Sequence, residues 1–268
     1  MANIHATAVV DPSARLGPSV EIGPFCVIGP DVELGEGAKV YSHAVITGHT
    51  SLGAGCEVFP FASIGQRPQD VKFRGEASTL TIGPKTTIRE HVTINPGTKG
   101  GHMATTVGAN CLLMIGAHIA HDCALGDNVT LVNGATLGGH VSIGDGAIIG
   151  GLSAVHQFVR IGAYAFVGGM TGITADVIPF GMAIGNRASL VGLNIVGLKR
   201  KGFPREQIHE LRQAYRMLFS SEGTLKERLE DVEGMFADNP LVKQIIDFIK
   251  TESDRSFCVP NNAAPPAR

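Results

Sequence analysis

The chain has 268 residues, a net charge of −2 and only 17% charged residues. A nucleic-acid-binding protein needs a basic excess to neutralise phosphates, so this charge argues against that class, and 44% hydrophobic residues argue against a disordered chain. No apolar run approaches the roughly 18 residues that span a bilayer. The first residues also lack a signal-peptide pattern, so we expect a cytoplasmic protein.

An aliphatic residue recurs at every sixth position from Ile4 to Ile64. The residue two before it is mostly small, and glycine, which occurs 35 times, often follows it. After one break the phase resumes at Ile82, and after a second break it shifts by one and runs from Val107 to Ile173. A period of six fits neither a helix nor simple alternation, but it fits a parallel β-helix in which three hexapeptides form one triangular coil of about 18 residues. The pattern resembles the left-handed hexapeptide β-helix, and that resemblance implies the handedness.

Two breaks interrupt the repeat, near residues 66–78 and 95–106. Long loops on a solenoid usually carry function, so both are candidates for substrate contacts. The small interior position is held by four of the five cysteines, which predicts buried packing thiols and no disulfide framework: Cys26, Cys56, Cys111 and Cys123.

Beyond the repeat, the period becomes helical from about Ser189. Helices are expected to start at Pro204 and to occupy residues 225–236 and 241–249. The sequence thus predicts a mainly β fold with two domains: a left-handed parallel β-helix in residues 1–188 and an α-helical C-terminal domain in residues 189–268, with residues 258–268, including Cys258, in a disordered tail.

Histidines concentrate in the second run of repeats. Subtracting one coil from each position shows which residues stack, and this places one patch on three adjacent coils: His121, Asp122, Gly139, His140, His156 and Gln157. A histidine beside a carboxylate is a general-base arrangement, because the carboxylate fixes the tautomer and steadies the imidazolium. The backbone N–H of Gly139 can serve a developing oxyanion. No cysteine or serine is placed as a nucleophile, so the patch suits direct acyl transfer to a hydroxyl.

Two other readings of the patch remain open. Three histidines on neighbouring coils can hold zinc with an open position, as in hexapeptide β-helix carbonic anhydrases, whose ligands come from more than one subunit. A structural or ice-binding solenoid is the other alternative, but the regular threonine array of such proteins is absent.

Five segments together resemble the UDP-N-acetylglucosamine acyltransferase family: His118-Ile-Ala-His121-Asp122-Cys, Gly138-Gly139-His140-Val, Ala154-Val-His156-Gln157-Phe, Gln69-Asp70-Val-Lys72 and Gly197-Leu-Lys199-Arg200-Lys201-Gly202-Phe. The resemblance covers nearly the whole chain. It implies a homotrimer with active sites between subunits, which transfers an (R)-3-hydroxyacyl group to the 3-hydroxyl of UDP-N-acetylglucosamine in the first step of lipid A synthesis. The donor is acyl carrier protein with its 4'-phosphopantetheine. The family implies no metal, no other cofactor, no nucleic acid and no stable membrane insertion.

The same resemblance implies roles for single residues. His121 is then the general base, Asp122 orients it, and the Gly139 N–H stabilises the oxyanion. Asp70 and Lys72 would come from the neighbouring subunit. Charge alone, apart from the resemblance, makes Arg205, Arg212 and Arg216 candidates to face the acidic carrier protein. The substrate-binding residues would be Gln69, Asp70, Lys72, His118, His140, His156, Gln157, Asn194, Arg200 and Lys201.

The position that sets acyl length in the family matches Gly169. A small residue there predicts a donor longer than ten carbons, although the adjacent Met170 weakens this prediction. Two positions depart from the family pattern: Val196 replaces a glutamate near the nucleotide, and Arg187 replaces a histidine that often contacts the donor. A related enzyme that acylates a 3-amino sugar nucleotide stays an alternative.

Overall fold

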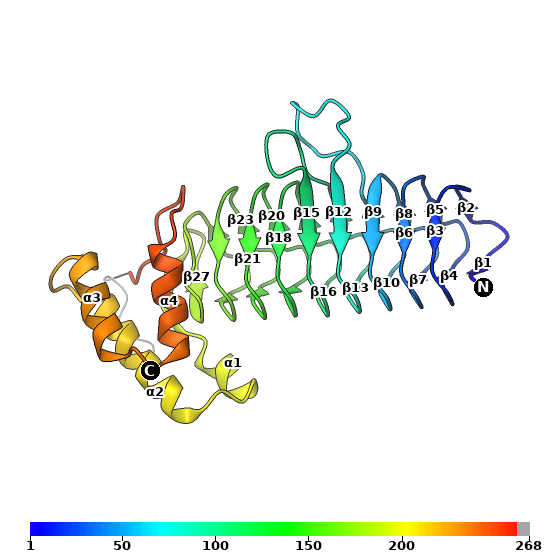
Figure 1. The fold of residues 1–268 in the computed structure, drawn as a ribbon. Helices are drawn as coiled ribbons and strands as arrows, with labels where there is room; N and C mark the ends of the chain where they lie inside the picture. Colours follow the sequence, from blue (N-terminus) through cyan, green and yellow to red (C-terminus); the bar gives the residue numbers. More distant parts are fainter. Residues whose placement is uncertain (262–268) are drawn as a thin grey trace.

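The structure is a computed structural model and describes residues 1–261. Short strands stack into three parallel sheets that form a triangular prism, and four helices lie at its C-terminal end (Figure 1). This arrangement, a left-handed parallel β-helix followed by a small helical part, confirms the predicted fold class. Within residues 1–261, no helix is long and apolar enough to cross a membrane.

Each sheet takes one strand from successive coils. The first sheet contains, in order, β1 (Asn3–Ile4), β4 (Glu21–Ile22), β7 (Lys39–Val40), β10 (Glu57–Val58), β13 (Thr87–Ile88), β16 (Leu112–Leu113), β19 (Thr130–Leu131), β22 (Ile148–Ile149), β25 (Phe166–Val167), β27 (Gly181–Ile184) and the antiparallel β28 (Ser189–Leu193). The second contains β2 (Val9–Val10), β5 (Val27–Ile28), β8 (Val45–Ile46), β11 (Ser63–Ile64), β14 (Thr93–Ile94), β17 (His118–Ile119), β20 (Thr136–Leu137), β23 (Ala154–Val155) and β26 (Gly172–Ile173). The third contains β3 (Arg15–Leu16), β6 (Glu33–Leu34), β9 (His49–Leu52), β12 (Thr79–Ile82), β15 (Ala104–Val107), β18 (Ala124–Leu125), β21 (Ser142–Ile143) and β24 (Arg160–Ile161).

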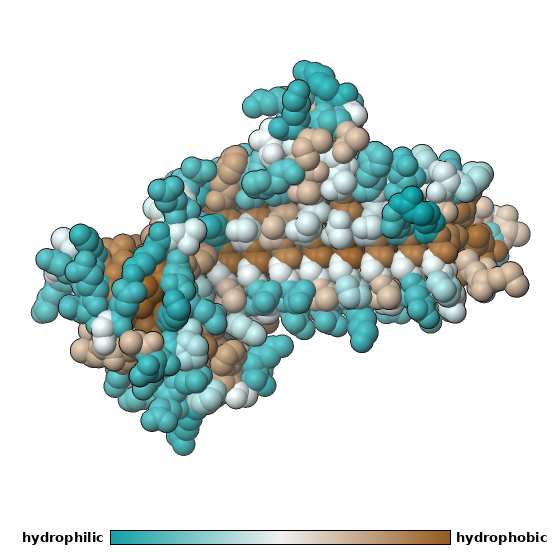
Figure 2. Space-filling model, viewed as in Figure 1, coloured by the Kyte–Doolittle hydropathy of each residue, from teal (hydrophilic) through white to brown (hydrophobic). Residues whose placement is uncertain are grey.

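The recurring aliphatic side chains form the core. His118 pairs with Thr136, and Thr136 with Ala154, so equivalent residues of successive coils stack directly. Ile119, Leu137 and the other inward aliphatics of these coils are almost completely buried. Burying one such side chain contributes roughly 1.5–3 kcal/mol. Figure 2 shows apolar side chains as a continuous band along the prism, between rows of paler small residues.

The corner between the second and third sheets, called the site corner below, has an unusual backbone. Asp122, His140 and Phe158 occupy equivalent turns there, with φ of 59°, 62° and 64°. An L-residue in this left-handed region costs roughly 1–2 kcal/mol. Glycine, Asn and Asp adopt such turns most readily, so the bulky His140 and Phe158 are unusual there. Backbone hydrogen bonds to the neighbouring coils, such as His140 N to His121 O at 3.0 Å, hold the turns in place.

Both breaks of the repeat are loops that leave the site corner. The first lies between β11 and β12, and the second between β14 and β15; the two project together from the prism (Figure 1). They brace each other: the Asn95 side chain donates to the carbonyl of Gln66 at 3.0 Å, and Lys99 N donates to the Glu76 carboxylate at 3.0 Å.

The C-terminal helices are α1 (Ile195–Arg200), α2 (Arg205–Leu218), α3 (Leu225–Met235) and α4 (Pro240–Lys250). The last three occupy the segments that were expected to be helical. The expectation that the helical period begins at Ser189 is wrong, because residues 189–193 form β28, which pairs with β27 and closes the end of the prism.

After α4, residues 251–260, called the C-terminal segment below, return along the last coils. Asp176 is wholly buried, and its backbone pairs with Ser256 and Cys258, while its carboxylate accepts from Arg160 Nε and Ser253 Oγ, both at 2.7 Å. Cys258 is buried too. The expectation of a disordered tail from residue 258 is therefore wrong for Cys258 and Val259, because both make long-range hydrogen bonds: Cys258 with Asp176, and Val259 with Leu190. Residues 262–268 of that expected tail lie outside the described residues.

Candidate active site

A histidine–aspartate pair lies at the site corner, between β17 and β18. His121 Nδ1 is 2.8 Å from Asp122 Oδ2. The Asp122 side chain is wholly buried, and that of His121 is 12% exposed. Because an ionised carboxylate only accepts, Nδ1 carries the proton of the neutral imidazole and the lone pair of Nε2 is free. The pair therefore has the geometry of an oriented general base.

The second loop holds Asp122 in place. Thr98 donates from its N–H at 3.1 Å and from its hydroxyl at 2.7 Å, and His102 N donates at 2.9 Å. Burial alone would raise the pKa of Asp122, but hydrogen bonds from Thr98, His121 and His102 outweigh burial and keep this pKa below its usual range. Sequence reasoning did not find Thr98 and His102. The one available signal was that their break leaves the same corner as His121.

The lowered pKa of Asp122 predicts a pH-dependent contribution to stability. Its native pKa lies below its unfolded value of about 3.9, so the unfolded state binds the proton more readily. This contribution is fully present above the unfolded pKa and is lost as pH falls through the native pKa. We expect the free energy of unfolding to fall more steeply below about pH 4 in the wild type than in Asp122→Asn. Urea unfolding across this range measures both slopes, and parallel curves would contradict the prediction.

A row of rings continues from the base along the corner. The ring of His140 meets that of His121 edge-on at 5.1 Å and stacks on Phe158 at 4.4 Å with an interplanar angle of 4°. Burial lowers the pKa of His140, against the opposing effect of Asp122 and Asp70. His140 is thus favoured as a neutral donor or acceptor beside the base.

Gly139 lies directly against the ring of His121. A Cβ on Gly139 would approach His121 Cε1 to 2.6 Å and Nε2 to 2.8 Å, so only glycine fits beside this ring position. Gly139 is buried, and its N–H donates to no other residue in the described part of the chain. An unpaired N–H next to the base is available to a developing oxyanion.

The remaining histidines of the patch differ in their surroundings. His118 Nδ1 is 2.7 Å from Thr93 Oγ1, and burial, with a smaller effect of His121, lowers the pKa of His118. His156 and Gln157 are exposed, and both contact Arg255 of the C-terminal segment, a residue that sequence reasoning missed.

The first loop carries Gln69, Asp70 and Lys72. Gln69 and Lys72 are exposed, and Lys72 N donates to Asp70 Oδ1 at 2.9 Å within a local turn. Asp70 is near enough to His140 of the same chain to raise its pKa. The contribution of Asp70 and Lys72 to a site on a neighbouring subunit stays a prediction, because the structure contains a single chain.

Other candidate residues lie apart from His121 in a single chain. Asn194 caps α1, accepting from Gly197 N at 3.0 Å and donating to the Tyr164 carbonyl at 3.0 Å. Arg200 and Lys201 are exposed at the end of α1, and α1 lies on the side of the prism opposite the two loops (Figure 1). Gly169 and Met170 form a turn between β25 and β26, which is the corner between the first and second sheets.

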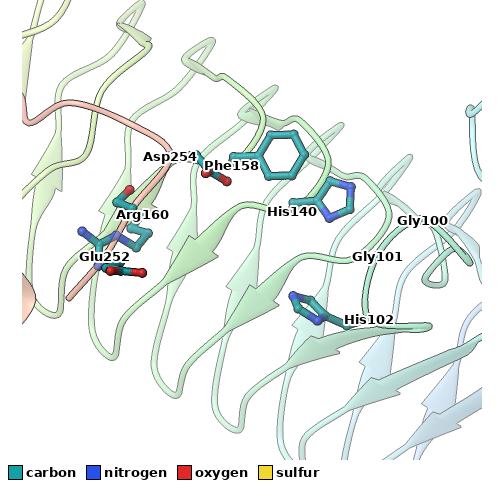
Figure 3. A pocket seen from close by; sticks show the side chains of 9 residues that line it. Gly100, Gly101, His102, His140, Phe158, Arg160, Glu252 and Asp254 are labelled. Carbon is teal, nitrogen blue, oxygen red and sulfur yellow. The ribbon is translucent and has the colours of Figure 1, made fainter.

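A groove of about 740 Å³ runs along the site corner. The second loop, with Gly101 and His102, borders one end, and Glu252 and Asp254 of the C-terminal segment border the other, while the rings of His140 and Phe158 lie between them (Figure 3). The groove therefore connects the second loop with the C-terminal segment, the two parts of the chain that contact the patch.

The donor set fits a zinc ion poorly. His121, Asp122 and His140 offer ligand atoms within 4.8 Å of one another. However, Asp122 Oδ1 already accepts from Thr98 N and His102 N, and Oδ2 accepts from Thr98 Oγ1 and His121 Nδ1. Binding a metal through Asp122 would break this network, and a centre with three histidine ligands and an open position is not what these side chains form.

The cysteines do not supply a nucleophile. All five are free and buried, which confirms the four packing thiols and corrects the placement of Cys258 in a disordered tail. Burial raises the pKa of Cys123, the cysteine next to Asp122, to about 12. A thiol with such a pKa is not ionised near neutrality, so it is a poor nucleophile.

Comparison with known proteins gives a consistent result. A sequence profile for domain 2 of UDP-N-acetylglucosamine O-acyltransferase matches residues 176–258, and a bacterial transferase hexapeptide profile matches residues 13–48 and 104–139. Acyl-[acyl-carrier-protein]–UDP-N-acetylglucosamine O-acyltransferases are 53% identical in Caulobacter vibrioides (96% of this chain, 98% of the relative) and 47% identical in Bartonella henselae (96% and 94%). The crystal structure of UDP-N-acetylglucosamine O-acyltransferase from Moraxella catarrhalis aligns with a TM-score of 0.92 at 40% identity, over 95% of this chain and 99% of that one.

Proposed function

The chain belongs to the UDP-N-acetylglucosamine O-acyltransferase family, and we infer from this that it transfers an acyl group from acyl carrier protein to UDP-N-acetylglucosamine in lipid A biosynthesis. The single observation that carries the chemistry is the His121–Asp122 pair with the unpaired N–H of Gly139 beside it. One oriented base and one oxyanion donor are the parts that direct acyl transfer needs.

In the proposed mechanism, His121 Nε2 takes the proton of the acceptor hydroxyl, which we propose to be the 3-hydroxyl of the sugar. The oxygen attacks the thioester carbonyl of an (R)-3-hydroxyacyl donor, and the Gly139 N–H binds the oxyanion that forms. When the intermediate collapses, the new ester bond remains and the C–S bond breaks. The imidazolium of His121, stabilised by Asp122, returns the proton to the phosphopantetheine thiolate.

We propose that the acceptor binds against the patch on one chain and against α1 of another. On this proposal one chain contributes His118, His140, His156 and Gln157, its neighbour contributes Asp70 and Lys72 of the first loop with Gln69 beside them, and Asn194, Arg200 and Lys201 lie near the nucleotide. The patch and α1 lie on opposite sides of one prism (Figure 1), which supports a site shared between subunits, and we propose that the subunits form a homotrimer. Arg205, Arg212 and Arg216 are exposed on α2, which suits a surface for the acidic carrier protein.

The two alternatives raised by the sequence are not favoured. Both carboxylate oxygens of Asp122 already accept hydrogen bonds, which argues against a zinc hydratase. The proposed chemistry needs no metal or other cofactor beyond the donor's own prosthetic group. The relatives named for UDP-N-acetylglucosamine argue against a 3-amino sugar acceptor.

A transfer assay tests the function. Purified protein is combined with UDP-N-acetylglucosamine and a panel of (R)-3-hydroxyacyl carrier proteins, with the 3-amino sugar nucleotide and acyl-coenzyme A as comparisons. We expect product with UDP-N-acetylglucosamine and carrier-linked donor. Product with the amino sugar alone would overturn the acceptor, and equal use of acyl-coenzyme A would overturn the need for the carrier.

Donor length gives a separate prediction about Gly169. A Cβ added there meets only backbone atoms of Gly151, the nearest at 3.3 Å, so a larger side chain would extend into open space. We expect the wild type to prefer acyl chains longer than ten carbons and Gly169→Met to prefer shorter ones. Competition between donors of different length measures the preference, and an unchanged ranking in Gly169→Met would rule out this position as the ruler.

A further inference from the structure

The C-terminal segment forms one wall of the groove at the site corner. Glu252 and Asp254 line it opposite the second loop (Figure 3). The segment is firmly anchored, because the buried carboxylate of Asp176 accepts from Ser253 Oγ at 2.7 Å and Cys258 N donates to the carbonyl of Asp176 at 2.8 Å. Arg255, between these two anchors, therefore has a defined position.

Arg255 reaches two residues of the patch on the neighbouring coil. Its Nη2 is 2.8 Å from His156 Nδ1, and its Nε donates to the carbonyl of Gln157 at 3.1 Å. A guanidinium has only donors, so His156 Nδ1 must accept at this distance. In the alternative, His156 Nδ1 carries the proton and donates to the Gln157 carbonyl at 3.2 Å. The N–H groups of Nδ1 and of Arg255 Nη2 would then face each other at 2.8 Å, which is unfavourable.

We propose that Arg255 is a positioning residue that fixes His156 as the tautomer with its proton on Nε2. His156 then presents a single N–H donor from Nε2, suited to a hydroxyl or phosphoryl oxygen of the acceptor, and it is not a second base at Nδ1. The Arg255 contact to Gln157 holds the adjacent turn in the same geometry. This proposal rests on the proposed acceptor site at His156 and Gln157.

Steady-state kinetics with a double-mutant cycle test the proposal. Because Arg255 acts through His156, we expect Arg255→Ala to raise KM for UDP-N-acetylglucosamine on the order of tenfold, the lower end of the scale for partners that orient metal-bound histidines, with a smaller change in kcat. Arg255→Lys should restore only part of the loss, because lysine lacks the fork that reaches both acceptors. In a His156→Ala background, Arg255→Ala should add less than about twofold. Lys243→Ala, which removes an exposed cation from α4, is the matched control.

Two results would overturn the proposal: an unchanged KM in Arg255→Ala, or full additivity of the two substitutions. Nitrogen-15 NMR of the histidines in the intact wild type covers the case in which Arg255→Ala misfolds. The His156 signal, identified by its loss in His156→Ala, should show a protonated Nε2 and an unprotonated Nδ1, and the reverse pattern would refute the proposal. A wild type without transfer activity would instead refute the proposed function, whereas the NMR measurement would remain a valid test of the His156 tautomer.

Discussion

Replacing His121 with alanine is expected to lower kcat by roughly 10²- to 10⁴-fold, the range of general-base catalysis, with the fold intact. The ring is at the corner and is not part of the aliphatic core, so its loss leaves the stacked coils in place. The measurement is kcat for transfer from carrier-linked donor to UDP-N-acetylglucosamine, with the melting temperature of each variant.

His49→Ala is the matched control for this experiment. His49 also lies near a carboxylate, with Nδ1 3.8 Å from Asp31 Oδ2, but this pair is exposed and lies on the N-terminal coils. We expect His49→Ala to retain wild-type activity. Equal losses in the two variants, or full activity in His121→Ala, would exclude His121 as the base.

The second large effect is expected from Gly101→Ala. A Cβ at Gly101 would overlap the carboxylate of Asp122, so the second loop or the carboxylate must move, and the base would lose its orientation. A misplacement of about 1 Å costs on the order of 10²-fold in rate, and we expect a loss of that size in kcat.

Gly100→Ala separates this effect from a general disturbance of the loop. A Cβ at Gly100 has Thr98 Oγ1 as its nearest neighbour, at 3.9 Å, which is ordinary contact. Neither glycine has a positive φ, so a left-handed backbone strains neither variant. Similar rates for Gly101→Ala and Gly100→Ala would show that the closed loop is not required to hold Asp122.

The sequence predicted the β-helix and the register of the site because the inward position of each coil must hold an aliphatic residue to fill the core. Once aliphatic residues fill that position from Ile4 onward, counting one coil brings Gly139 next to His121. The hydrogen bonds from Thr98 and His102 could not be predicted in this way, since a loop without a period has no register to count.

Two regions beyond the repeat show the same limit. Residues 189–193 form a strand because β27 offers them a pairing edge, which local composition does not reveal. Cys258 was expected in a disordered tail, yet its N–H donates to the carbonyl of Asp176, far away in the chain, and the Asp176 carboxylate also accepts from Ser253, two residues before Arg255. Contacts that depend on a buried partner from another part of the chain are visible only in the structure.

The two corners of the prism also bear on how such an enzyme changes over evolutionary time. His121 turns at the corner between the second and third sheets, whereas Gly169 turns at the corner between the first and second. In a solenoid each coil contacts mainly its neighbours, so a substitution at residue 169 leaves the hydrogen bonds of Asp122 untouched. If residue 169 sets donor length, lineages can adapt the fatty chain of their envelope lipid through single substitutions at one corner while the catalytic corner stays under separate selection.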